Sequence, residues 1–130
     1  MSGRNHRYIS FETPLIVGDP RPSKDPDWIW DDLRWAEVES SNIWKSFGGH
    51  GRLLQREAAT RGATLKDIDD ADLIYFAAHG YVDPAEPLDG SYLVLGDGRL
   101  TTREIQKLSL AKKPVVVLSA CHTGEGLLTV

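Results

Sequence analysis

The stretch Pro-Val-Val-Val-Leu-Ser-Ala at residues 114–120, followed by Cys121, decides the fold of this chain. A second stretch of the same kind, Leu-Ile-Tyr-Phe-Ala-Ala at residues 73–78, is followed by His79. Such short, continuous apolar runs are typical of strands that are buried on both faces of a parallel sheet. Ligands and reactive groups of open α/β sheets collect at the carboxyl ends of the strands. The sequence therefore predicts that His79 and Cys121 meet at one edge of a sheet, as a thiol–imidazole pair.

Strand and helix patterns alternate along the rest of the chain. The other expected elements are a strand at 15–17, a helix from 32 to 47, a short strand at 53–54, a helix from Thr60 or Thr64 to about 69, and a hairpin of 92–95 with 99–100. Thr101 and Glu104 fit a capping box that begins a last helix, and residues 81–90 read as a loop. This alternation indicates an α/β fold with a mostly parallel sheet and right-handed crossovers.

The order of the patterns also predicts an incomplete sheet. The strand at 114–120 is expected to be central and buried on both faces, yet few residues follow Cys121 and they read as a tight, glycine-bearing loop. Such a sheet leaves an apolar edge open, which we expect a further part of a longer polypeptide or a second chain to cover. We therefore expect one domain over residues 1–130 that lacks its C-terminal strands.

Composition narrows the classes of function and of partner. The net charge of −4 and the absence of a Lys/Arg cluster argue against a nucleic-acid partner. No apolar stretch approaches the length of a membrane span, and the N-terminus is polar, unlike a signal peptide. A single cysteine excludes an internal disulfide and fits a reducing compartment, so we expect the protein in the cytoplasm. No metal-ligand spacing, P-loop or dinucleotide motif occurs, and we expect neither a metal nor a cofactor.

The residues at the two strand ends have the chemistry of nucleophilic catalysis. A cysteine attacks as its thiolate, and a neighbouring imidazole can take the thiol proton and later return it to a leaving amine. Gly80 permits a sharp turn after His79, and we expect the amides of Gly80 and Cys121 to hold a developing oxyanion. His122 adjoins Cys121, but neighbouring side chains tend to point apart, so His79 is the preferred base.

Each residue also has an alternative interpretation without catalysis. A lone cysteine after a valine-rich strand is more often a packed small side chain, and a lone histidine at a strand end is more often structural or exposed. Trp35 and Trp44, on the expected first helix, suit a core or a partner surface better than a cofactor site. The position of both His79 and Cys121 at strand ends favours the catalytic interpretation.

Two blocks of the sequence resemble those of a known family, the CHAT domains, which are caspase-like and often lie beside tetratricopeptide repeats. Residues 73–80 resemble the His-Gly block of that family, and residues 115–124 are similar to its Cys block, Leu-Ser-Ala-Cys-x-Thr-Gly. The hairpin and helix between them, and the strand before Pro20, follow the family order. The resemblance implies a caspase-like three-layer sandwich and a cysteine endopeptidase that cleaves polypeptides, with His79 as base and acid and Cys121 as nucleophile.

The chain departs from the family pattern in two ways. His122 stands where the family commonly has Glu, and the strands and helices that follow the Cys block in the family, completing the sheet and the substrate cleft, are absent. We therefore expect little or no peptidase activity from these residues alone. Activity would need a C-terminal half or a partner, such as a tetratricopeptide-repeat region.

Substrate selection and alternative functions complete the expectations. Related caspase-like enzymes select the residue before the cut through charges at the cleft rim, where Asp19 is predicted to lie and would favour a basic side chain. The alternative for Asp19 is a turn residue before Pro20, a role that suits Asp well. For the whole chain, the alternatives are a non-catalytic interaction or regulatory module and a hydrolase that acts on a small ester or amide.

Overall fold

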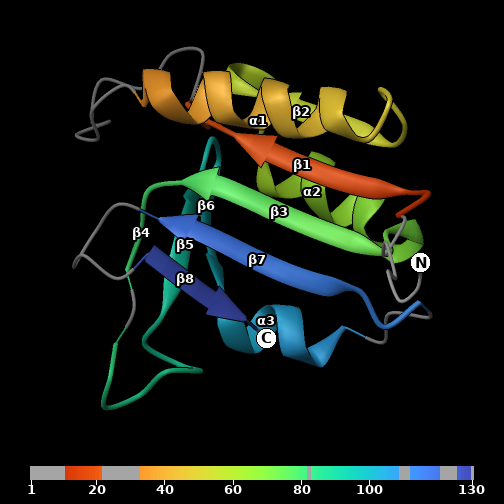
Figure 1. The fold of residues 1–130 in the computed structure, drawn as a ribbon. Coiled ribbons are helices and arrows are strands. Elements are labelled where there is room, and N and C mark those ends of the chain that lie inside the picture. Colours follow the sequence, from red (N-terminus) through yellow and green to blue (C-terminus); the bar gives the residue numbers. More distant parts are fainter. Residues whose placement is uncertain (1–10, 22–32, 82, 109–111, 121–125, 130) are drawn as a thin grey trace, which may run out of the picture.

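The computed structural model describes residues 11–21, 33–81, 83–108, 112–120 and 126–129, and for residues 120 and 126–129 it describes the backbone only. The centre of the fold is a five-stranded sheet in the order β2-β1-β3-β7-β8 (Figure 1). Helices lie on both faces of this sheet, so the chain forms three layers. The predicted α/β class is confirmed.

Four neighbouring strands of the sheet are parallel. They are β2 (Arg52–Gln55), β1 (Pro14–Gly18), β3 (Leu73–Ala78) and β7 (Val115–Ala120). All four were predicted from their apolar runs. The fifth strand, β8 (Gly126–Thr129), was missed and pairs antiparallel with β7. The expectation that the strand of residues 114–120 ends the sheet is therefore wrong, because β8 covers its outer edge.

Of the helices in the described ranges, the second and third begin at a capping threonine that the sequence predicts, and the first begins without a side-chain cap. Three α-helices connect the strands there. They are α1 (Arg34–Ser46), α2 (Arg61–Asp67) and α3 (Thr102–Lys107), with short 3₁₀ turns at η1 (Arg56–Ala58) and η2 (Ile68–Asp70). Thr60, one of the two expected starting residues, caps α2 by accepting a hydrogen bond from the backbone N–H of Ala63 at 3.0 Å. The predicted capping box of Thr101 and Glu104 is present at α3. No helix in the described ranges has the length and apolar character that a membrane crossing requires.

A small antiparallel sheet lies beside the carboxyl end of β3. It consists of β4 (Gly80–Tyr81), β5 (Tyr92–Leu95) and β6 (Gly98–Thr101), in that order. The hairpin of β5 and β6 was predicted, whereas β4 lies in part within the expected loop. Because β4 begins one residue after His79, this small sheet fixes the backbone on the far side of the candidate base.

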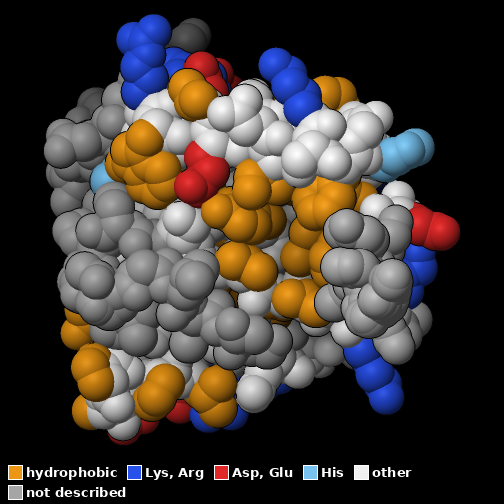
Figure 2. Space-filling model, in the orientation of Figure 1, with side chains coloured by type: hydrophobic (Ala, Val, Ile, Leu, Met, Phe, Trp, Pro, Cys, Tyr) orange, Lys and Arg blue, Asp and Glu red, His pale blue; other side chains and the backbone are white. Residues whose placement is uncertain are grey.

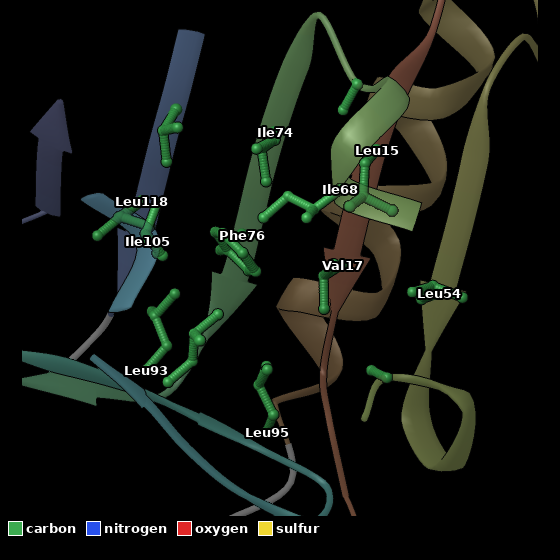
Figure 3. Packing of buried hydrophobic residues seen from close by; sticks show 14 residues of the cluster. Leu15, Val17, Leu54, Ile68, Ile74, Phe76, Leu93, Leu95, Ile105 and Leu118 are labelled. Atoms are coloured by element: carbon green, nitrogen blue, oxygen red, sulfur yellow. The ribbon is translucent and has the colours of Figure 1, made fainter. Parts of the chain in front are cut away.

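The main core lies between the sheet and the layer formed by α2, η2 and α3. Its central side chains are Leu15, Val17, Ile74, Phe76 and Leu118, and they face Ile68, Ile105 and the hairpin residues Leu93 and Leu95 (Figure 3). On the other face, Leu33 and Ala36 at the start of α1 pack against Ala77 and Tyr75 of β3. The two clusters together bury both faces of β1 and most of β3.

The valine run predicts that β7 is buried on both faces, and this prediction is wrong. Val116 and Leu118 are buried in the main core, but Val115 is 42% exposed and Val117 is only partly buried. These two side chains point to the face of the sheet that carries α1, and α1 packs mainly against β1, β2 and β3. Figure 2 shows hydrophobic side chains gathered in the middle of this face, below α1. A continuous apolar run thus lies in a strand with one covered and one partly open face.

Close contact between α1 and β1 depends on Gly18. A Cβ atom at this position would lie 2.1 Å from the hydroxyl oxygen of Ser40 and 3.0 Å from the carbonyl oxygen of Ala36. Ser40 is fully buried, and its hydroxyl accepts a hydrogen bond from the Gln55 side chain at 2.9 Å. Only glycine therefore allows the helix to approach the end of β1 this closely.

Candidate active site

The carboxyl ends of β3 and β7 lie next to each other in the sheet. Six register pairs join the two strands, from Leu73 with Val115 to Ala78 with Ala120. His79 directly follows one member of the last pair, and Cys121 follows the other. Cys121 and His122 lie outside the described residues, so the contact between thiol and imidazole stays a prediction.

His79 links the main sheet to the small antiparallel sheet. His79 is 7% exposed, and its carbonyl oxygen accepts a hydrogen bond from the backbone N–H of Val94 at 2.8 Å. β3 holds its backbone on one side and β4 on the other. The residue that carries the imidazole thus lies between two paired strands, an arrangement that suits the positioning of a reacting group.

The backbone of Gly80 is oriented by the ladder that it shares with β5. Gly80 and Leu93 are register partners, and the next pair along, His79 and Val94, exchanges the hydrogen bond given above. Hydrogen-bonded and non-hydrogen-bonded pairs alternate in an antiparallel ladder. The N–H of Gly80 therefore points away from β5, an orientation compatible with its predicted role as an oxyanion donor. That role and the one predicted for the Cys121 amide stay predictions.

Asp19 lies at the same carboxyl edge, directly after β1, but its carboxylate is engaged inside the protein. The residue is 2% exposed, and its Oδ1 accepts a hydrogen bond from the N–H of Leu33 at 3.0 Å. Its Oδ2 lies 3.3 Å from a guanidinium nitrogen of Arg56, which also binds Glu37 at 2.8 Å. The side chain therefore joins the start of α1 to the end of β2. These contacts favour the structural alternative for Asp19, and selection of a basic substrate residue stays a prediction.

Backbone strain accompanies this ion pair. Asp19 and Arg56 follow Gly18 and Gln55, the last register pair of β1 and β2, and both have left-handed φ angles, of 48° and 56°. Such angles are uncommon for residues other than glycine. The N–H of Asp19 also donates to the carbonyl of Ala77 at 2.9 Å, two residues before His79. No local pattern pointed to Arg56, because its partner Asp19 is 37 residues away in the chain.

A polar chain crosses the α1 face of the sheet below this edge. The Tyr75 hydroxyl donates to Glu39 Oε2 of α1 at 2.8 Å and is also hydrogen-bonded by Ser119 of β7. Burial of the ring and the neighbouring Glu39 carboxylate raise the pKa of Tyr75 to about 12. The three side chains tie α1, β3 and β7 together.

Metal binding finds no support in the described ranges. No group of three or more His, Cys, Asp or Glu side chains is arranged there to hold an ion.

The comparisons with known proteins identify a family. The family model of the CHAT domain matches residues 2–129. No curated protein matches the chain.

Proposed function

Because this chain belongs to the CHAT domain family, a caspase-like and protease-related family, we propose that it is a cysteine endopeptidase domain. His79 is the general base and acid, and Cys121 is the nucleophile. The substrate is a polypeptide, and neither a metal nor a cofactor takes part. A location in the cytoplasm belongs to this proposal, since a single free cysteine fits a reducing compartment.

One observation carries the proposal. Ala78 and Ala120 are register partners at the carboxyl ends of two adjacent parallel strands, and the proposed base and nucleophile are the residues that follow them. Adjacent parallel strands lie about 4.8 Å apart, so residues one position beyond such a pair start from neighbouring backbone positions. This supports a dyad without requiring any rearrangement of the sheet.

The reaction follows from these groups. His79 takes the proton of the Cys121 thiol, and the thiolate attacks the carbonyl carbon of the scissile peptide bond. The amides of Gly80 and Cys121 donate to the oxyanion that forms. His79 then gives its proton to the leaving amine as the C–N bond breaks, which leaves a thioester. A water molecule that loses its proton to His79 hydrolyses the thioester and restores the thiol.

Full activity in this proposal needs a further segment or partner. The partly open face over β7 leaves room for further elements beside the sheet. A C-terminal half or a tetratricopeptide-repeat region would supply them. The experiment must therefore separate formation of the dyad from turnover of a substrate.

Alkylation of the thiol makes this separation. We expect Cys121 to react with iodoacetamide well below pH 8, because a paired imidazole stabilises the thiolate. His79→Ala should move the pH profile of this reaction upward towards that of a free cysteine, near about 8.5. His50→Ala, which changes an exposed histidine elsewhere, should leave the profile unchanged. A wild-type thiol that reacts only above pH 8, or a profile indifferent to His79→Ala, contradicts the proposal.

A second candidate, a non-catalytic interaction module, is favoured by the burial of His79 at 7% exposure. In that case the histidine is a packed structural residue and the thiol reacts as an ordinary or buried cysteine. The same alkylation profile distinguishes the two functions. Cleavage of a peptide panel by the protein joined to its further segment, lost in Cys121→Ala, would then demonstrate the peptidase.

A further inference from the structure

The small antiparallel sheet continues directly from the candidate base and has one face turned away from the core (Figure 1). Leu93 and Leu100 are register partners in β5 and β6, and both are buried in the main core. Because side chains alternate along a strand, Tyr92 and Arg99, each one position earlier, point to the opposite face. Tyr81 of β4 is the register partner of Tyr92 and belongs to the same face.

Three side chains of this outer face are stacked on one another. The ring centroids of Tyr81 and Tyr92 lie 5.8 Å apart, at an interplanar angle of 37°. The guanidinium carbon of Arg99 lies 4.3 Å from the centroid of the Tyr92 ring, within the range of a cation–π contact. Tyr81 is 37% exposed and Arg99 is exposed as well, so solvent reaches both ends of this Tyr81–Tyr92–Arg99 stack.

The charge of Arg99 has no carboxylate beside it. Among the described residues no Asp or Glu forms an ion pair with Arg99, whereas Arg61 of α2 pairs with Glu104 at 2.7 Å. Stacking uses the flat side of a guanidinium and leaves the N–H groups at its edge able to donate in the plane. A carboxylate fits that edge with two parallel hydrogen bonds. The stack therefore holds a cation in the orientation that an acidic side chain requires.

The register of the ladder places this cation close to the candidate base. Val94 is the register partner of Arg99 on one side, and on the other side its N–H donates to the His79 carbonyl oxygen at 2.8 Å. Two strand spacings of about 4.8 Å thus separate the backbones of His79 and Arg99, about 10 Å in all. An extended chain advances about 3.3 Å per residue, so this span corresponds to about three residues of a bound polypeptide.

β4 also offers a backbone edge for an extended polypeptide. In the described part of the chain β4 pairs with β5 alone, and the N–H of Gly80 points away from β5. Extended peptides bind such edges by main-chain hydrogen bonds, while their alternate side chains are selected by neighbouring groups. Tyr81 directly follows Gly80, and its ring is the end of the stack nearest to this edge.

We propose that the Tyr81–Tyr92–Arg99 stack selects the polypeptide substrate by binding an Asp or Glu side chain about two or three residues from the scissile bond. The carboxylate accepts hydrogen bonds from the Arg99 guanidinium, which the Tyr92 ring holds in place. This inference rests on the proposed function, since it takes His79 and Cys121 as the centre of the cleft.

Peptides that alkylate Cys121 test this selection without requiring turnover. Peptide chloromethyl ketones carry the electrophile at the C-terminal end, and chloroacetyl peptides carry it at the N-terminal end, so the two sets extend to opposite sides of the scissile position. In both sets the cysteine sulfur displaces chloride and forms a C–S bond. Each set is made with glutamate, glutamine or lysine second or third from the electrophile.

The measurement is the rate at which each peptide labels the full chain, followed by intact mass. We expect at least one set to label about fivefold faster with glutamate than with glutamine, as a partly exposed ion pair gives, and slowest with lysine. Arg99→Gln should abolish this preference, and Arg99→Lys, which keeps the charge but lacks the planar edge, should retain part of it. Arg52→Gln, the same change at an exposed arginine at the amino end of β2, should leave the preference intact.

The outcomes separate this inference from the proposed function. Equal rates with glutamate and glutamine in both sets, a preference that survives in Arg99→Gln, or no labelling by any peptide overturns the inference. A dyad confirmed by the iodoacetamide profile, with equal peptide rates, would support the peptidase and overturn only the selection. A glutamate preference lost in Arg99→Gln, with a profile indifferent to His79→Ala, would contradict the peptidase and support the binding of acidic side chains.

Discussion

Replacing Gly18 with alanine should separate α1 from β1. The added Cβ would lie 2.1 Å from the Ser40 hydroxyl oxygen, 2.5 Å from the Ser40 Cβ and 3.0 Å from the Ala36 carbonyl oxygen. Real Cβ contacts below 3.0 Å essentially do not occur, so something must move. A rotation of the Ser40 side chain cannot relieve the clash, because its Cβ is fixed by the helix backbone.

The expected loss in the free energy of unfolding is near the upper end of the losses that overpacked cores show. Extra methyl groups in well-packed cores cost about 1–3 kcal/mol. Here α1 must shift as a unit, and the buried hydrogen bond from Gln55 to Ser40 is at risk as well, which adds about 1 kcal/mol. We expect Gly18→Ala to lower the free energy of unfolding by about 3–4 kcal/mol.

Urea unfolding followed by circular dichroism measures this loss, and Gly62→Ala is the matched control. A Cβ at Gly62, in the first turn of α2, would meet only an Asp97 carboxylate oxygen at 3.9 Å. The control should be neutral or stabilising by about 0.5–1 kcal/mol. The second change Ser40→Gly should recover part of the loss in Gly18→Ala. A loss below about 1 kcal/mol in Gly18→Ala would refute the reasoning, because the helix would then yield at little cost.

Three further predictions concern single contacts. Asp19→Ala should cost about 3 kcal/mol in the free energy of unfolding, because it removes the acceptor of the Leu33 N–H and the carboxylate that contacts the Arg56 guanidinium. In urea unfolding, Asp19→Asn, which keeps an acceptor, should cost less, and equal costs would contradict this account. Thr101→Ala should cost about 1 kcal/mol by removing the cap of α3, measured by thermal unfolding, whereas an unchanged melting temperature would mean that the cap is dispensable. Since the pKa of Tyr75 is raised from 10.0 to about 12, the unfolded chain loses this proton first, and stability should fall as pH rises between those values. Urea unfolding across this range should show a shallower decline for Tyr75→Phe, and parallel curves would count against the shift.

Local patterns predicted the elements whose signals are contained within a few residues. β3 has the predicted bounds, because an apolar run of six residues lies between a polar turn and a histidine. The caps of α2 and α3 were likewise readable, since Thr60 and Thr101 bond to residues three positions later. β8 was missed because four residues, Gly-Leu-Leu-Thr, have no pattern that distinguishes a strand from a loop.

Features that depend on packing between segments far apart in the chain could not be predicted from the sequence. The valines of β7 have the same side chain, yet Val116 is 3% and Val115 is 42% exposed, because burial depends on which layer lies over each face. The engagement of Asp19 by Arg56 depends on the neighbouring ends of β1 and β2. At the candidate site, the sequence predicts that β3 and β7 are neighbours, and the structure confirms it. The placement of Gly80 in β4 was not predicted.

The pairing of β3 with β7 also governs how the protein assembles during translation. β3 binds β1 on one edge, but its other partner begins 42 residues later in the chain, from Leu73 to Val115. Until the ribosome has released β7, a nascent chain presents one apolar strand edge with unpaired amides, a surface prone to aggregation. The proposed base follows β3 and the proposed nucleophile follows β7 in the chain, so the dyad proposed above requires this late closure.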